Sequence, residues 1–298
     1  MREATKGIIA LVGTCTVWGL SGIYYKLLEH VPPIEILAHR TLWSLIFFAA
    51  ALAVQGRLAA LMGAIGTRHA LMLTALAALM ISTNWFVFIT SIQVGRAMEA
   101  SLGYYVFPLV AVLLGAVVLK ERLGRAQRVA VVLAALAVVT LSLGLGVPPW
   151  IALILSISFG LYGLVKKGLS VGPVVSVTAE VLLLAPVALV VLWLAHADGG
   201  GAFGTSVRDS ALLAFSGLLT GAPLILFSYA TKRITLATVG LVQYLNPTLQ
   251  FLVATFWFLE PFSPWHALAF GMIWVALAIY TTASWRQDRA ARRAVFRS

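Results

Sequence analysis

Two charged residues stand at corresponding places in two apolar segments, 140 positions apart along the chain. Arg40 lies within segment 35–54, next to His39, and Glu180 lies within segment 174–194. A charged side chain inside a membrane faces protein or water rather than lipid. A guanidinium binds a carboxylate through paired hydrogen bonds, and a carboxylate attracts an ammonium group. His39, Arg40 and Glu180 are therefore predicted to bind a zwitterion such as an amino acid, unless Arg40 extends to the membrane surface instead.

The chain contains only two asparagines, Asn84 and Asn246, and both fall within apolar segments. A side-chain amide in hydrocarbon must find hydrogen-bond partners inside the protein. It either lines a polar site or joins two helices, where such a bond contributes about 0.6 kcal/mol on average. Both asparagines are candidates for substrate binding, with helix–helix bonding as the alternative.

Two prolines, Pro108 and Pro247, lie well inside apolar segments. Each lacks an N–H group and so frees the backbone carbonyl four residues earlier, at Tyr104 and Gln243. Interrupted helices at corresponding places in two halves of a chain point to a transport site. We predict a helix break at each proline and include Gln243 among the binding residues. A kink without a role in transport is the alternative.

Aromatic residues make up 11% of the chain. Those deep within apolar segments offer faces on which an amphipathic or aromatic ligand can stack. Packing within the protein is the alternative for each of them. The aromatic candidates for substrate binding are Trp18, Trp85, Tyr104, Tyr105, Tyr162 and Tyr244.

The chain that positions these residues has the composition of an integral membrane protein. Of its 298 residues, 61% are hydrophobic and 10% are charged, whereas soluble domains carry about 25% charged residues. The apolar segments are long and continuous rather than alternating, so we predict membrane-spanning helices instead of barrel strands. The ten predicted spans cover residues 7–27, 35–54, 70–92, 97–119, 127–145, 149–167, 174–194, 210–230, 235–258 and 265–284.

Several kinds of chemistry lack the residues that they need. One cysteine, Cys15, and five dispersed histidines give no pattern for a metal site. The sequence has no phosphate-binding glycine loop, and its acidic residues are scattered rather than paired for catalysis. We therefore predict no metal, no cofactor and no enzymatic activity.

The basic residues predict the orientation of the chain in the membrane. Of the 21 lysines and arginines, 17 fall in one set of alternate connections together with the two termini, and 4 fall in the other set. Cytoplasmic loops carry the excess of positive charge, so both termini are predicted to be cytoplasmic. The net charge of +11 reflects this bias, and we expect no nucleic-acid partner. The basic tail, residues 286–298, is expected to contact anionic lipid head groups.

The two halves of the chain resemble each other. The run WGLSG at 18–22 corresponds to FGLYG at 159–163, which is an offset of 141 residues. Pro108 stands 13 residues before Glu121, and Pro247 stands 13 residues before Glu260, which is an offset of 139. Two separate landmarks therefore indicate a repeat of about 140 residues that contains five spans.

An odd number of spans in each copy inverts the second copy relative to the first. Inverted repeats are typical of secondary transporters that work by alternating access. The predicted fold is therefore all-α, an integral membrane protein with ten transmembrane helices in two inverted five-helix repeats. The repeats cover residues 1–145 and 146–285, and the basic tail follows.

Short stretches along the whole chain carry a resemblance to a known family. They include EILAHR at 35–40, NWF at 84–86, EASLGYY at 99–105, FGLYGL at 159–164, QY at 243–244, PTL at 247–249 and IWVALAI at 273–279. In these stretches the chain resembles the EamA family of the drug/metabolite transporter superfamily, and within it the RarD branch. The pattern departs at Phe107, where asparagine is expected. The resemblance implies two inverted five-helix repeats in a bacterial inner membrane.

The resemblance also implies the export of small metabolites, amino acids or drugs. We predict a secondary active exporter of small metabolites, above all amino acids, including aromatic or amphipathic ones. The alternative is multidrug efflux of the chloramphenicol type, and a passive channel is a further, less favoured one. The predicted partners are a small-molecule substrate and membrane lipids, while the oligomeric state stays open.

Overall fold

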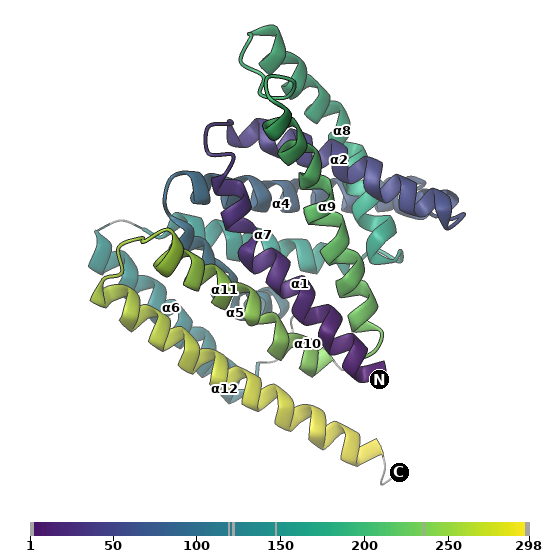
Figure 1. Ribbon diagram of the computed structural model, residues 1–298. Helices are drawn as coiled ribbons and strands as arrows, with labels where there is room; N and C mark the ends of the chain where they lie inside the picture. The colour runs from purple at the N-terminus through teal and green to yellow at the C-terminus, as the bar shows by residue number, and fades with distance from the viewer. Residues whose placement is uncertain (1–2, 119, 121–122, 147, 235, 296–298) are drawn as a thin grey trace.

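The computed structural model describes residues 3–118, 120, 123–146, 148–234 and 236–295, which form an assembly of helices (Figure 1). The elements of the first half are α1 (Glu3–Lys26), α2 (Pro33–Val54), the 3₁₀ helix η1 (Leu58–Leu61), α3 (Met62–Ile65), α4 (Arg68–Gln93), α5 (Ala97–Val118) and α6 (Arg125–Leu145). The elements of the second half are α7 (Trp150–Lys166), α8 (Pro173–Ala197), α9 (Val207–Thr231), α10 (Leu236–Gln243), α11 (Leu245–Leu252), the π-helical η2 (Val253–Trp257) and α12 (Pro264–Val295).

Eight of these helices are long and apolar enough to cross a membrane: α1, α2, α4, α5, α6, α8, α9 and α12. Two of the predicted spans differ from this description. The segment predicted at 149–167 is α7, an apolar helix of 17 residues, which falls short of the length that a span typically needs. The segment predicted at 235–258 is divided into α10, α11 and η2. The all-helical membrane fold is confirmed, while the count of ten continuous spans is not.

The helices pack in reciprocal sets that relate the two halves of the chain. Helix α1 packs on α9 and α11, while α7 packs on α4 and α5. Helix α2 packs on α9, and α4 packs on α8. The remaining principal pairs, α2 with α8, α5 with α11, and α6 with α12, each join corresponding helices of the two halves. Figure 1 shows the last pair lying side by side along one edge of the assembly.

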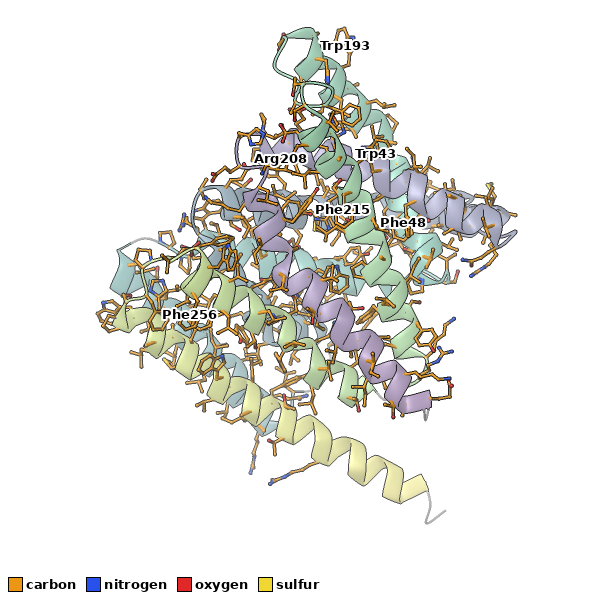
Figure 2. The ribbon with its side chains drawn as sticks, in the orientation of Figure 1. Trp43, Phe48, Trp193, Arg208, Phe215 and Phe256 are labelled. Atoms are coloured by element: carbon orange, nitrogen blue, oxygen red, sulfur yellow. The ribbon has the colours of Figure 1, made fainter. Side chains whose placement is uncertain are left out.

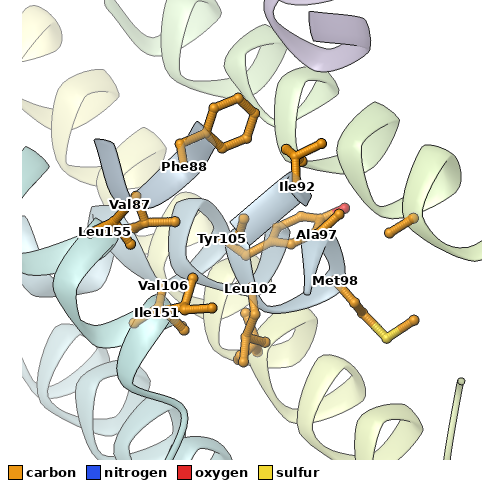
Figure 3. Packing of buried hydrophobic residues seen from close by; sticks show 14 of the residues in the cluster. Val87, Phe88, Ile92, Ala97, Met98, Leu102, Tyr105, Val106, Ile151 and Leu155 are labelled. Atoms are coloured by element: carbon orange, nitrogen blue, oxygen red, sulfur yellow. The ribbon is translucent and has the colours of Figure 1, made fainter. Parts of the chain in front are cut away.

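The core lies where α4, α5 and α7 meet (Figure 3). Figure 3 shows Phe88 of α4, Leu102 and Val106 of α5, and Ile151 and Leu155 of α7 gathered in one cluster. Each of these side chains is at most 5% exposed. Burial of this kind fixes the relative positions of three helices that also carry polar side chains, as described below.

Large apolar side chains also cover the outside of the assembly. Trp193 of α8 and Phe256 of η2 are 68% and 72% exposed, and both project outward in Figure 2. In water such side chains would lose the free energy that burial provides, whereas lipid is their natural solvent. The outer surface therefore fits a protein embedded in a bilayer.

Two glycines allow helices from opposite halves to approach closely. A Cβ atom on Gly103 of α5 would lie 2.9 Å from the backbone oxygen of Ala152 in α7. A Cβ atom on Gly217 of α9 would lie 2.4 Å from the backbone carbon of Trp43 in α2. Backbone contact through small residues is the usual way in which membrane helices pack.

The connection after η2 stabilises the start of α5. The two carboxylate oxygens of Glu260 accept hydrogen bonds from the backbone N–H groups of Ala97 and Met98, at 2.6 and 2.8 Å. The first N–H groups of a helix have no partner within the helix, so this carboxylate satisfies two of them. Its counterpart in the first half, Glu121, lies outside the described residues.

Candidate functional site

Arg40 of α2 is buried among aromatic rings rather than directed to the membrane surface. Its side chain is only 7% exposed. One guanidinium nitrogen, Nη1, donates a hydrogen bond to the hydroxyl of Tyr25 in α1, at 2.6 Å. The guanidinium carbon lies 4.1 Å from the centre of the Trp85 ring in α4. Three helices of the first half therefore hold this cation in place.

The charge of Arg40 has no acidic counterpart in the part of the chain that the structure describes. Its Nε atom is buried without a hydrogen-bond partner. Glu35, one turn earlier on α2, instead accepts a hydrogen bond from the backbone N–H of Ala202 at 2.7 Å. A buried cation is costly unless a negative group compensates it. The guanidinium is thus prepared to receive an anion.

Glu180 of α8 is paired within its own half of the chain. The carboxylate is 1% exposed and lies 2.5 Å from the ammonium nitrogen of Lys166, the last residue of α7. Ser176 donates a hydrogen bond to the same carboxylate oxygen at 2.9 Å, and Tyr162 donates to the other oxygen at 3.1 Å. Glu180 therefore does not face an open site as the sequence predicts, because Lys166 already neutralises it.

A series of aromatic rings connects the surroundings of Arg40 with those of Glu180. Tyr25 lies 5.9 Å from Phe88 between ring centres, and Phe88 lies 5.9 Å from Tyr104. Tyr104 lies 6.1 Å from Phe159, which stacks on Tyr162 at 6.0 Å. Neighbouring rings at these distances attract one another. We refer to Tyr25, Phe88, Tyr104, Phe159 and Tyr162 as the aromatic series.

Asn84 of α4 braces the middle of the aromatic series. Its amide nitrogen donates to the backbone oxygen of Leu155 at 2.9 Å and to the hydroxyl of Ser158 at 3.0 Å, both in α7. Its amide oxygen accepts a hydrogen bond from the Tyr104 hydroxyl at 2.8 Å. The amide thus joins α4, α5 and α7, which is the alternative that the sequence left open.

Four other candidates lie apart from Arg40 and Glu180, around the packing of α5 on α11. The Tyr105 hydroxyl is 2.7 Å from the Thr248 hydroxyl, and the Tyr105 ring is 5.9 Å from that of Phe270 in α12. Asn246 accepts a hydrogen bond from Gln250 of the same helix at 3.1 Å. The other two candidates in this region, which are half-buried, are Gln243 and Tyr244.

The two prolines have different effects on their helices. Helix α5 runs without interruption through Pro108, so the helix break predicted there is wrong. The second segment is interrupted at Tyr244, between α10 and α11, and Pro247 lies just inside α11. Proline is tolerated in the first turn of a helix, where its missing N–H group needs no helical partner. Only the second half therefore has a divided helix at this place.

Trp18 and His39 belong to neither group. The Trp18 ring is 6.2 Å from that of Phe227 in α9. The His39 ring stacks on Phe203 of the connection between α8 and α9, with ring centres 5.0 Å apart. Its Nε2 atom lies 4.0 Å from the carboxylate of Glu35 and has no hydrogen-bond partner. His39 and Glu35 thus fasten that connection to α2.

The sequence analysis missed two residues that complete the charged positions, Tyr25 and Lys166. Lys166 was placed in a cytoplasmic connection because of its neighbour Lys167, whereas it ends α7 and reaches Glu180. The internal repeat held the signal. Tyr25 precedes Arg40 by 15 residues and Lys166 precedes Glu180 by 14, so each charge contacts the corresponding place of the preceding helix. Phe107, the departure from the family pattern, lies 4.7 Å from Phe159 between ring centres.

Comparisons with known proteins relate the whole chain to membrane transporters. Residues 5–143 match the EamA-like transporter family. The chain is 42% identical to protein RarD of Streptomyces exfoliatus over 294 residues, which are 98% of this chain and 92% of that protein. It is 40% identical to the uncharacterized transporter YojE of Bacillus subtilis (strain 168), over 97% of this chain and 98% of that protein.

A solved structure shares the fold. A crystal structure of another protein aligns with a TM-score of 0.62 and 18% sequence identity, covering 94% of this chain and 98% of that one. At this level of identity the match concerns the arrangement of helices alone. It shows that the arrangement described above occurs in another protein.

Proposed function

Because the chain belongs to the EamA-like transporter family and its RarD branch, we propose that it is a secondary active exporter of amino acids and related small metabolites. The protein is a multi-pass inner-membrane transporter, as its apolar helices and its relatives show. The substrate class and the direction of transport are our proposal. It includes a cytoplasmic location for both termini, on the evidence of the basic residues.

The reciprocal packing supports two inverted repeats, residues 1–145 and 146–285, as the basis of alternating access. Each principal contact between the halves either has a counterpart with the halves exchanged or joins corresponding helices. Under this proposal, α7 and the divided helix α10–α11–η2 complete ten spans. A shift of one repeat against the other then opens the shared region first to one side and then to the other.

The observation that carries the proposed substrate class is the buried guanidinium of Arg40. It is held by Tyr25 and Trp85, it lacks a carboxylate partner among the described residues, and its Nε donor is unused. A substrate carboxylate supplies the missing charge and accepts from a planar guanidinium through paired hydrogen bonds. The aromatic series beside it offers apolar contact for the rest of the substrate.

Counterflow in liposomes tests this proposal. The purified full-length protein is reconstituted, the liposomes are loaded with one unlabelled amino acid at a time, and the uptake of the labelled form is followed. We expect saturable counterflow for a subset of amino acids and its loss in Arg40→Ala, with partial recovery in Arg40→Lys. Counterflow of chloramphenicol but of no amino acid would favour drug efflux, and flux without counterflow would favour a channel. Either result would overturn the proposal.

A further inference from the structure

We propose that the site selects a substrate with a net single negative charge, a carboxylate without an ammonium group, and that Lys166 enforces this selection. The proposal rests on the function proposed above and narrows its substrate class. It concerns Lys166 of α7, Glu180 of α8 and Arg40 of α2, the three charges at the two ends of the aromatic series.

The ammonium of Lys166 occupies the place that suits a substrate ammonium. Its nitrogen lies 2.5 Å from the Glu180 carboxylate and 5.0 Å from the centre of the Tyr162 ring. It also donates a hydrogen bond to the hydroxyl of Ser176. A carboxylate beside an aromatic face is the environment that recognises an alkylammonium ligand. In this structure the protein's own lysine fills that environment.

Displacing Lys166 would expose an unpaired charge. Its side chain is 21% exposed, while that of Glu180 is 1% exposed. A substrate ammonium that took over Glu180 would leave the lysine ammonium without its partner in a largely apolar region. Breaking a buried ion pair is costly because the group left behind has lost its water as well as its partner. The pair therefore opposes zwitterions and cations.

The balance of charge points in the same direction. Lys166 and Glu180 cancel each other, so the positive charge of Arg40 remains without compensation. A monoanion neutralises the site, whereas a zwitterion adds no net charge and leaves the excess in place. Because uncompensated charge inside a membrane protein is costly, the neutral assembly is favoured.

Three ligands with the same aromatic body separate the possibilities: 3-phenylpropionate, L-phenylalanine and 2-phenylethylamine. Their binding to the purified full-length protein in detergent is measured by isothermal titration calorimetry. We expect 3-phenylpropionate to bind at least as tightly as phenylalanine, and phenylethylamine to bind about tenfold more weakly or less. Tighter binding of phenylalanine by about tenfold, or binding of none of the three, would overturn the proposal.

Substitution of Lys166 tests its role directly. In Lys166→Met the Glu180 carboxylate becomes available, and we expect the preference to shift toward phenylalanine by about tenfold. Lys167→Met removes the same charge one residue later, from an exposed side chain, and should keep the wild-type preference. If Lys166→Met does not fold, the double variant Lys166→Met/Glu180→Gln removes both charges and should retain the preference for 3-phenylpropionate. An unchanged preference in Lys166→Met, or a preference for phenylalanine in the double variant, would contradict the role of Lys166.

The outcome is distinguishable from failure of the proposed function. Amino-acid counterflow together with a wild-type preference for phenylalanine would retain the exporter and reject the monoanion. Binding and counterflow of 3-phenylpropionate without counterflow of any amino acid would reject amino acids as substrates and support the monoanion.

Discussion

The guanidinium of Arg40 lies over the ring of Trp85, 4.1 Å from its centre, and joins α2 to α4. Both residues belong to the set predicted from the sequence, and the structure shows them in direct contact. An arginine over a desolvated indole gains about 2 kcal/mol from the attraction between the cation and the ring. The ring compensates part of the buried charge, and it does so without occupying the donors that a carboxylate needs.

We therefore predict that Trp85→Leu weakens substrate binding more than Trp85→Phe. The leucine variant loses the attraction to the ring, so the guanidinium is no longer fixed, and we expect a loss of affinity of roughly tenfold. The phenylalanine variant keeps a ring and should lose less. Concentration dependence of counterflow in liposomes measures both. Equal affinities in the two variants would show that the ring does not position Arg40.

The Lys166–Glu180 pair yields a prediction about stability. Glu180→Gln leaves the lysine ammonium without its charged partner, which costs about 3 kcal/mol, the lower end of the range for a buried pair since Lys166 is partly exposed. Thermal unfolding in detergent should show a clear decrease in the midpoint. The double variant Lys166→Met/Glu180→Gln should recover most of the loss. A double variant less stable than Glu180→Gln would contradict a pairwise origin.

The prolines are predicted to differ in their influence on transport. Pro247→Ala adds an N–H group at the place where α10 and α11 are separated, which favours one continuous helix and should slow counterflow several-fold. Pro108→Ala adds the group to a helix that is already continuous, so the effect should be smaller. Expression and thermal unfolding serve as controls for both variants. Wild-type rates for Pro247→Ala would leave the division of the helix without a role.

Glu260 lies in the connection between η2 and α12, where its burial raises the pKa of the carboxyl above its ordinary value of 4.5, although two backbone N–H groups favour the charged form. The folded state then holds more protons than the unfolded state just above pH 4.5. The stability that this contributes is complete below the unfolded pKa and is lost as the pH rises through the folded pKa.

We therefore expect the free energy of unfolding of the wild type, relative to Glu260→Gln, to fall as the pH rises from about 4.5, which is the unfolded value. Unfolding in detergent at a series of pH values measures the difference. A difference that stayed constant, or that increased with pH, would show that hydrogen bonding to the charged form exceeds the effect of burial.

The orientation in the membrane is tested by reporter fusions. Placed after Ser298 and after Glu29, they should report the cytoplasm and the periplasm respectively, because the basic residues gather in the connections on the side of the termini. A fusion that reports the same side at both places would reject the proposed topology. The measurement does not depend on the identity of the substrate.

Much of this protein was determined by the sequence alone. Long apolar segments separated by charged and turn residues specify membrane helices, because lipid leaves the backbone no other way to satisfy its hydrogen bonds. The offset between Arg40 and Glu180 identified corresponding places in the two halves before any contact was known. The departures concern length and continuity, since a proline such as Pro108 kinks or interrupts a helix according to its tertiary surroundings.

Tertiary structure alone decided which partners these residues have. Lys166 follows an apolar segment and precedes a second lysine, so its sequence context indicates a cytoplasmic connection, yet packing of α7 beside α8 brings it to Glu180. Asn84, equally suited to a ligand, is used by Tyr104 and α7 instead. Hydrogen bonds and ion pairs act over a few ångströms, whereas residue types and spacing in the chain leave the distances between helices open. The charges of the site are thus present in the sequence, and their compensation is a property of the fold.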